Sequence, residues 1–257
     1  FRNTQEAFRL TLDDGNSLLS ARVNEAGWLA VTAQQSGYKG SVTVYNSTFD
    51  KTVIQINLSS TFIMDAVLSP DCKTVAILTL GQSGGSYESQ VRFYPVDQKE
   101  PSAVVSLGNL VPLDLDYENG ALWVLGEDEV VIVSPNGKET ATYSLGGNYL
   151  KGCDLGGDGF AVLLLGRYRA GSANQIVTVD SNGEEIATQS LTSSVLSFDA
   201  AGRYFSLLTG DTLTIYTSDM TTYSILEHTQ NARYTALSSS GAAVLANAQQ
   251  AWLYLPN

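Results

Sequence analysis

Short runs of apolar residues alternate with polar turns along the whole chain. At six places an apolar residue is followed by Ser, Asn, Asp or Gly, then by a tight turn and a second apolar run. The clearest example is Val67–Leu78, in which Ser69, Pro70 and Asp71 form the turn. Short apolar runs bounded by turn residues predict β-strands, and no window shows a convincing helical period. The sequence therefore predicts an all-β fold.

The six units recur at a nearly constant spacing. Their equivalent turn positions are 45, 48, 39, 43 and 39 residues apart and are occupied by Gly27, Cys72, Gly120, Gly159, Gly202 and Gly241. Each complete unit reads as four strands, and a period near 43 residues is the size of one four-stranded antiparallel blade of a β-propeller. We predict one domain over residues 1–257 that forms a six-bladed β-propeller. The alternative, seven blades, needs a further unit that the repeat does not contain.

The two ends of the chain have complementary defects. Residues 8–12 alternate like the closing strand of a unit, but no unit precedes them. The last unit ends after Ala251–Leu255 without a closing strand. A strand from the N-terminus that completes the last blade would remove both open sheet edges. We therefore predict that residues 7–12 close the propeller.

Charge and hydropathy exclude several classes of partner. Fourteen Lys and Arg stand against 26 Asp and Glu, so the net charge is −12, which repels nucleic acid. The longest apolar run, Phe160–Leu165, has six residues, far fewer than a membrane-spanning helix needs. We expect a monomer with no nucleic-acid partner and no membrane-spanning segment within this chain.

Few residues have the spacing that catalysis or metal binding requires. The single histidine, His228, lies in a polar segment, and there is no Gly-x-Ser-x-Gly nucleophile motif. One histidine and two distant cysteines cannot build an ordinary zinc site, and Asp114–Gly120 lacks the glycine spacing of a calcium-binding loop. We therefore assign no catalytic residue, no metal and no cofactor, and the sequence favours a non-enzymatic role while leaving an enzymatic one open.

Loop length distinguishes one face of the predicted propeller. The connection between the second and third strands is short in three units and long in the other three, at residues 33–40, 81–89 and 166–173. These loops combine Tyr with Gly, Ser and Arg, a composition typical of adaptable binding loops. We predict that they contact a partner through Gln35, Tyr38, Lys39, Gln82, Tyr87, Arg167, Tyr168 and Arg169.

The start of each innermost strand should reach the same face, around the mouth of the central channel. This places Asp65, Asp114, Asp154 and Arg233 among the candidate ligand-binding residues, together with Lys151. The main hypothesis is a binding or scaffolding module that engages a protein or a glycan. The alternative is a hydrolase that acts on a glycan or a peptide with acids at the channel mouth, such as Asp65 and Asp114.

The apolar-Ser-Pro-Asp turn at Leu68–Asp71 and the four-strand unit resemble the WD40-like and surface-layer propeller repeats of bacteria. No unit carries the Trp-Asp and Gly-His signatures of WD40 blades. The chain also looks like a propeller family of gut Firmicutes without an assigned function. That resemblance implies an exported, cell-surface protein with an N-terminal membrane anchor. A first residue Phe1 rather than Met agrees with the expectation of a preceding segment.

Overall fold

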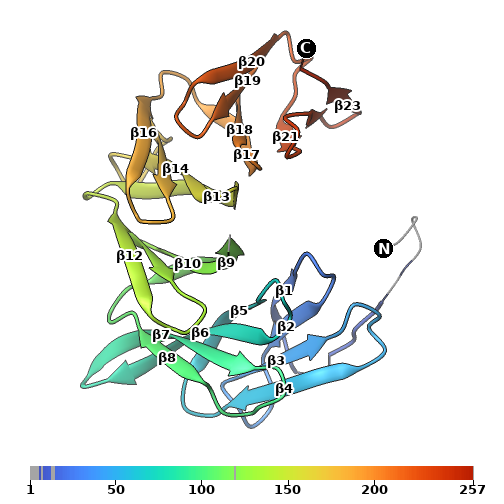
Figure 1. The fold of residues 1–257 in the computed structure, drawn as a ribbon, viewed down its shortest axis with the longest axis vertical. Helices are drawn as coiled ribbons and strands as arrows, with labels where there is room; N and C mark the ends of the chain where they lie inside the picture. Colours follow the sequence, from blue (N-terminus) through green and yellow to red (C-terminus); the bar gives the residue numbers. More distant parts are fainter. Residues whose placement is uncertain (1–5, 7, 13–14, 119, 257) are drawn as a thin grey trace. The chain divides into compact units, whose positions relative to one another are not determined.

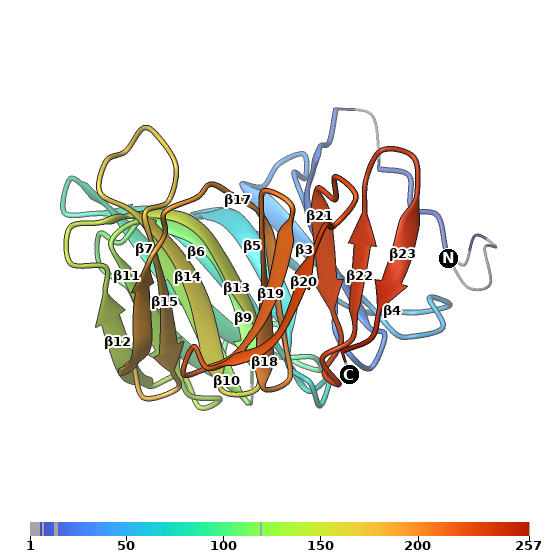
Figure 2. The ribbon, with the colours of Figure 1, turned by 90° about the horizontal axis from the view of Figure 1, so that it is seen from above.

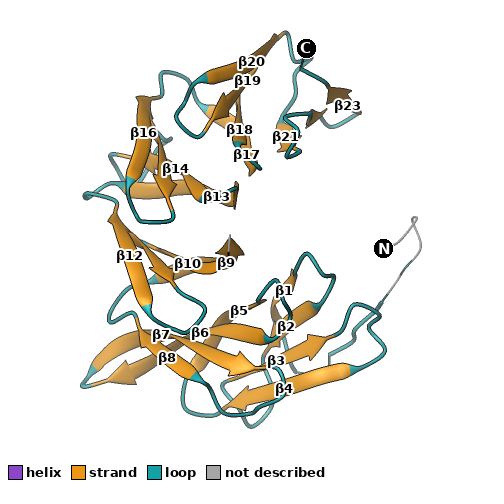
Figure 3. Cartoon of the chain, viewed as in Figure 1, coloured by secondary structure: helices purple, strands orange, loops and turns teal. Residues whose placement is uncertain are grey.

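A computed structural model describes residues 6, 8–12, 15–118 and 120–256. Within these residues every regular element is a β-strand, as predicted, and Figure 3 shows strands joined by loops and turns. No helix in the described part of the chain is long and apolar enough to cross a membrane.

In the described part of the chain, twenty-three strands form six sheets (Figure 1). The first sheet contains β1 (Leu18–Val23), β2 (Leu29–Ala33), β3 (Gly40–Tyr45) and β4 (Thr52–Leu58). The second contains β5 (Phe62–Leu68), β6 (Thr74–Ser83), β7 (Ser86–Pro95) and β8 (Ala103–Ser106). The third contains β9 (Pro112–Glu118), β10 (Ala121–Gly126), β11 (Glu129–Val133) and β12 (Glu139–Ser144).

The remaining sheets follow the same order. The fourth contains β13 (Tyr149–Gly157), β14 (Phe160–Gly166), β15 (Gln175–Asp180) and β16 (Glu185–Ser190). The fifth contains β17 (Val195–Ala201), β18 (Tyr204–Thr209), β19 (Thr212–Thr217) and β20 (Thr222–Glu227). The sixth has three strands, β21 (Tyr234–Leu237), β22 (Ala243–Ala246) and β23 (Ala251–Tyr254). Strands that are consecutive in sequence are neighbours in each sheet, so the predicted six units are six sheets.

The chain divides into two compact units, Phe1–Val124 with Val133–Glu139, and Leu125–Ile132 with Thr140–Asn257. In the first unit the facing surfaces of the first two sheets bury one cluster of aliphatic side chains, which includes Val42, Val44, Ile63 and Ile77. The second strands are the most buried because neighbouring sheets cover both of their faces; in β6, Val75, Ala76 and Ile77 are all fully buried.

In the second unit each sheet also packs on the next. Phe160 and Val162 of β14 pack with Phe205 and Leu207 of β18. The sixth sheet lies beside the fifth, as Figure 2 shows, and Leu245 is buried in the cluster between them. The apolar runs of the sequence are therefore the contact surfaces of successive sheets.

The first strand of at least four sheets carries a β-bulge near its start. The register shifts between Leu18 and Ser20 in β1 and between Ile63 and Asp65 in β5. It shifts at the equivalent place in β13 and β17. A bulge leaves one residue outside the regular pairing and turns its side chain to a new direction. In the first unit these extra residues are Leu19 and Met64.

One predicted long loop is instead the end of a β-hairpin. The expected long loop at residues 81–89 is a continuation of two strands, because Gly81 pairs with Glu88 and Gln82 with Tyr87. The turn between them consists of Gly84 and Gly85, both at positive φ, as a two-residue hairpin turn requires. The sequence around this turn is polar, and the pairing partner that makes it a hairpin is visible in the structure alone.

The last sheet lacks a fourth strand, as the sequence predicts: β23 pairs with β22 and with no other strand of the described chain. Residues 8–12 form no strand in the structure, and residue 7 lies outside the described residues. The Phe8 ring instead stacks on Phe49, with ring centroids 5.1 Å apart, and contacts Tyr45 at the same distance. The pairing of residues 7–12 with the last sheet stays a prediction.

Candidate functional site

A groove of the first unit lies where the loop after β2 meets the start of β5. Its volume is about 610 Å³. Three of the predicted binding residues line it, Gln35, Tyr38 and Lys39. Because these three residues occupy one eight-residue loop, the structure brings this part of the prediction together at one surface.

The other wall of the groove is apolar. Leu19 and Met64, the residues displaced by the bulges of β1 and β5, line it together with Phe62 and Leu80. Phe62 is 54% exposed and Met64 is 43% exposed, although large apolar side chains in strands are usually covered. The two bulges therefore direct flexible apolar side chains away from the core and into the groove.

The Lys39 side chain adds one positive charge to this apolar surface. The Lys39 ammonium group lies 4.3 Å from the centre of the Phe62 ring, which is a cation–π contact. No carboxylate is among the described residues that line the groove. Lys39 is the one charged side chain among the described residues that line the groove.

The remaining loop residues of the prediction lie at other places. Gln82 and Tyr87 face each other across the extended β6–β7 hairpin. Arg167, Tyr168 and Arg169 lie in the loop after β14, where Tyr168 is 71% exposed. Arg169 forms an exposed ion pair with Glu127 at 3.3 Å. Of the three long loops, the first is the one whose residues are among the described lining of the groove.

Two of the candidate acids have a structural partner that the sequence analysis missed. Arg22 of β1 donates hydrogen bonds from Nε (3.0 Å) and Nη2 (2.8 Å) to Oδ2 of Asp65 in β5. The same Nη2 group contacts Asp114 of β9. One guanidinium thus ties together the inner strands of three sheets. Asp65 and Asp114, the acids named for the hydrolase alternative, have this ion-pair role in the structure.

Asp154 of β13 faces a second acid, Asp199 of β17. The Asp154 carboxyl accepts a hydrogen bond from the Gly156 N–H (2.8 Å), and Asp199 accepts one from the Leu237 N–H (2.5 Å). Burial and the nearby Asp199 charge raise the pKa of Asp154 to about 6. Burial also raises the pKa of Asp199. Asp154 therefore takes up a proton at a higher pH than an ordinary aspartate, near pH 6.

The two remaining basic candidates are held in different ways. Lys151, the bulge residue of β13, donates from Nζ to the Arg169 carbonyl oxygen (2.7 Å). Arg233 lines a separate polar pocket beside the last sheet. Within the described part of the chain no group of three or more His, Cys, Asp and Glu side chains is arranged to hold a metal ion.

Sequence reasoning missed Arg22, Leu19, Phe62 and Met64. The signal was present in weak form, because Leu19 and Met64 each stand just before the polar residue, Ser20 or Asp65, at which strand pairing resumes. A strict alternating pattern assigns such residues to the core or to solvent and has no position for a bulge.

Comparison with solved structures shows the fold class. The C-terminal WD40 domain of Sif2 aligns with a TM-score of 0.53 and 10% identity, over 97% of this chain and 84% of that one. Hsv2 from Kluyvelomyces marxianus aligns with a TM-score of 0.57 and 12% identity, over 89% and 76%. At such low identity the likeness concerns the β-propeller fold alone.

Comparison with curated proteins gave no match. The comparison with protein families gave a match over residues 11–235 to DUF5711, which is described as a family of unknown function. This match covers most of the chain, so the protein belongs to that family of unknown function.

Proposed function

We propose that this protein is a non-enzymatic binding module that holds an extended segment of a partner protein in the groove between Tyr38 and Met64. The observation that carries the proposal is the exposure of Phe62, Met64 and Leu19 on one lined surface. Exposed apolar side chains that gather in a groove mark interaction sites, whereas scattered ones do not. The WD40-like structural neighbours support a protein-binding or scaffolding role.

The groove favours a protein over a glycan. Leu19, Phe62 and Met64 offer apolar contact area, and aromatic and Met side chains are enriched at the centres of protein interfaces. Lys39 can pair with an acidic residue of the bound segment. We therefore assign the groove to a segment with apolar side chains and one carboxylate.

The test replaces groove residues and follows partner capture. The intact chain and the variants Tyr38→Ala, Phe62→Ala and Met64→Ala are immobilised and exposed to extracts of the source organism. We expect a protein that the intact chain retains and that at least Phe62→Ala loses, with about a tenfold drop in affinity, as interface anchors typically show. The control Tyr168→Ala removes an exposed tyrosine outside the groove. A partner that all four variants retain equally would disprove the groove assignment.

We also propose that the protein acts at a bacterial cell surface, held by an N-terminal anchor. The support is the resemblance of its turns and units to bacterial surface propeller repeats, together with its acidic surface. Protease treatment of intact cells that carry the full-length protein tests this location. Degradation of the propeller in intact cells is the expected result, and full protection until the cells are lysed would contradict the proposal.

A further inference from the structure

A second pocket, in the other compact unit, has the opposite chemistry. It lies between the segment that precedes β21 and the turn between β22 and β23, and its volume is about 380 Å³. Amide side chains dominate its lining, and Ala248 is the one apolar side chain among the described residues that form it. Its size is in the range of small-ligand sites.

Hydrogen bonds fix the floor of this pocket. The Asn247 Oδ1 atom accepts from the backbone N–H groups of Gln249 (2.9 Å) and Gln250 (3.0 Å). The Asn247 Nδ2 group donates to the Gln230 carbonyl oxygen (3.2 Å), which joins the two sides of the pocket. Asn247 therefore holds the two sides of the pocket together.

The chain enters the pocket in an unusual backbone conformation. Gln230 and Asn231 have positive φ values of 52° and 60°, which side chains other than glycine adopt at a cost. Thr229 anchors the segment, because its hydroxyl donates to Asp211 (3.1 Å) and its carbonyl accepts from the Ala232 N–H (3.0 Å). This conformation places the Asn231 side chain at the pocket.

Three exposed side chains line the pocket and have no protein hydrogen-bond partner among the described residues: the guanidinium of Arg233 and the amides of Asn231 and Gln249. The backbone of Arg233 is held by its N–H bond to the Ala246 carbonyl (2.8 Å), so the base of this side chain is fixed while its charged end is available. In a chain of net charge −12, no carboxylate lines the pocket to neutralise it.

The hydrogen-bonding groups of the pocket indicate which chemical groups its ligand carries. A guanidinium binds a carboxylate through two parallel hydrogen bonds, and a primary amide both donates to and accepts from neighbouring hydroxyl groups. An acidic sugar carries both kinds of group, a carboxylate and several hydroxyls, on one small ring. We propose that the pocket between Asn231, Arg233 and Gln249 binds an acidic sugar, with its carboxylate on Arg233 and its hydroxyl groups on the two amides. This proposal does not depend on the proposed function.

The experiment uses the whole chain and D-glucuronate as the probe, with binding measured by isothermal titration calorimetry. D-Glucose, which lacks the carboxylate, and N-acetylglycylglycine, a peptide carboxylate, are the comparison probes. We expect glucuronate to bind in the millimolar range and at least about ten times more tightly than glucose. Arg233→Gln should weaken glucuronate binding about tenfold and leave glucose unchanged, because the lost contact is to the carboxylate.

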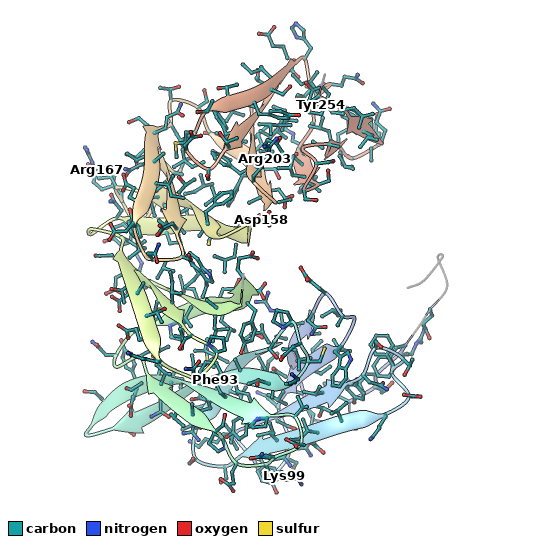
Figure 4. The ribbon with its side chains drawn as sticks, in the orientation of Figure 1. Phe93, Lys99, Asp158, Arg167, Arg203 and Tyr254 are labelled. Carbon is teal, nitrogen blue, oxygen red and sulfur yellow. The ribbon has the colours of Figure 1, made fainter. Side chains whose placement is uncertain are left out.

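Matched variants separate the site from a general charge effect. Arg167→Gln removes the same charge from an exposed arginine of the same unit whose side chain points away from the strands (Figure 4). It should leave binding unchanged. Asn231→Gly keeps the positive φ and removes the amide, so it should weaken both sugars. Tyr38→Ala, in the apolar groove, should have no effect.

Three results would overturn the proposal. Absence of glucuronate binding at the highest soluble concentration would show that the pocket is not a site for an acidic sugar. Equal weakening by Arg233→Gln and Arg167→Gln would show a general charge effect. Tighter binding of N-acetylglycylglycine than of glucuronate would show that the pocket recognises the C-terminal carboxylate of a peptide. Thermal unfolding of each variant confirms that it is folded, which is expected because the replaced side chains are exposed.

Discussion

Arg22 and Asp65 join the inner strands of the first two sheets through two hydrogen bonds to a single carboxylate oxygen, Oδ2. The Asp65 side chain is 12% exposed, and the arginine is 37% exposed. Removal of the partner of a nearly buried carboxylate is destabilising, because water cannot fully replace the lost hydrogen bonds. The pair is therefore expected to contribute to stability.

Replacement of Arg22 by Met should lower the free energy of unfolding by about 1–2 kcal/mol, a value reduced because solvent partly screens the arginine. The corresponding loss of Tm is about 2–8 °C for a chain of this size. The double variant Arg22→Met with Asp65→Asn should recover part of the loss, because no unpaired charge is left. Arg9→Ala, which breaks an exposed pair with Glu6, is the control and should change the Tm by less than about 2 °C. Similar losses for Arg22→Met and Arg9→Ala would contradict the structural role of Arg22.

The raised pKa of Asp154 predicts how the stability of the protein depends on pH. Its pKa in the folded chain is raised to about 6, above the value near 4 of an unfolded aspartate. The folded state then binds more protons than the unfolded state between about pH 4 and pH 6, so this group's contribution to stability falls as the pH rises through that window. Asp154→Asn, which imitates the protonated form, should raise the Tm at pH 7.5 and have little effect at pH 4.

Asp180 provides a control of opposite sign. Although partial burial opposes the effect, hydrogen bonds from the Glu184 and Asn182 N–H groups lower the pKa of Asp180. Its contribution is present at neutral pH and is lost as the pH falls through the lowered pKa. Asp180→Asn should therefore lower the Tm at pH 7.5 more than at pH 3. Equal effects of the two substitutions at both pH values would contradict the opposite pKa shifts of Asp154 and Asp180.

Gly137 combines two constraints. Its φ is +72°, and a Cβ atom there would lie 2.4 Å from the Cβ of Ala103. Gly108 also has a positive φ, +62°, but open space surrounds it. Gly108→Ala should cost about 1 kcal/mol from backbone strain alone, and Gly137→Ala should cost at least about 2 kcal/mol because steric overlap is added. Urea denaturation measures both, and equal losses would show that the backbone conformation decides the cost.

Closure of the last sheet by residues 7–12 can be tested by hydrogen exchange. The outer edge of β23 has no described strand beside it, and an unpaired edge strand exchanges its amide hydrogens readily. If residues 7–12 pair with it, the amides of Ala251–Tyr254 should be protected in the intact chain. Deletion of residues 1–12 should remove that protection while β21 and β22 keep theirs. Protection of β23 that survives the deletion would exclude this closure.

The sequence by itself determined the strands, their grouping into six units and the three-stranded last unit. These features follow from local patterns: apolar runs of strand length, turn residues between them and a regular period. The Asn136–Gly137 turn is a case in point, since its dipeptide predicts the hairpin that joins β11 and β12. Gln35, Tyr38 and Lys39 were found because they share one loop.

Tertiary structure decided everything that depends on contact between units of the repeat. Arg22 pairs with Asp65 and Asp114, residues 43 and 92 positions away, which no local pattern encodes. The bulges at Leu19 and Met64 arise from pairing with the neighbouring strand and bring the two side chains into one groove. The hairpin at Gly84 and Gly85 likewise needs its partner strand. Local residue preferences specify strands and turns, whereas a binding surface forms where side chains from separate strands meet in space.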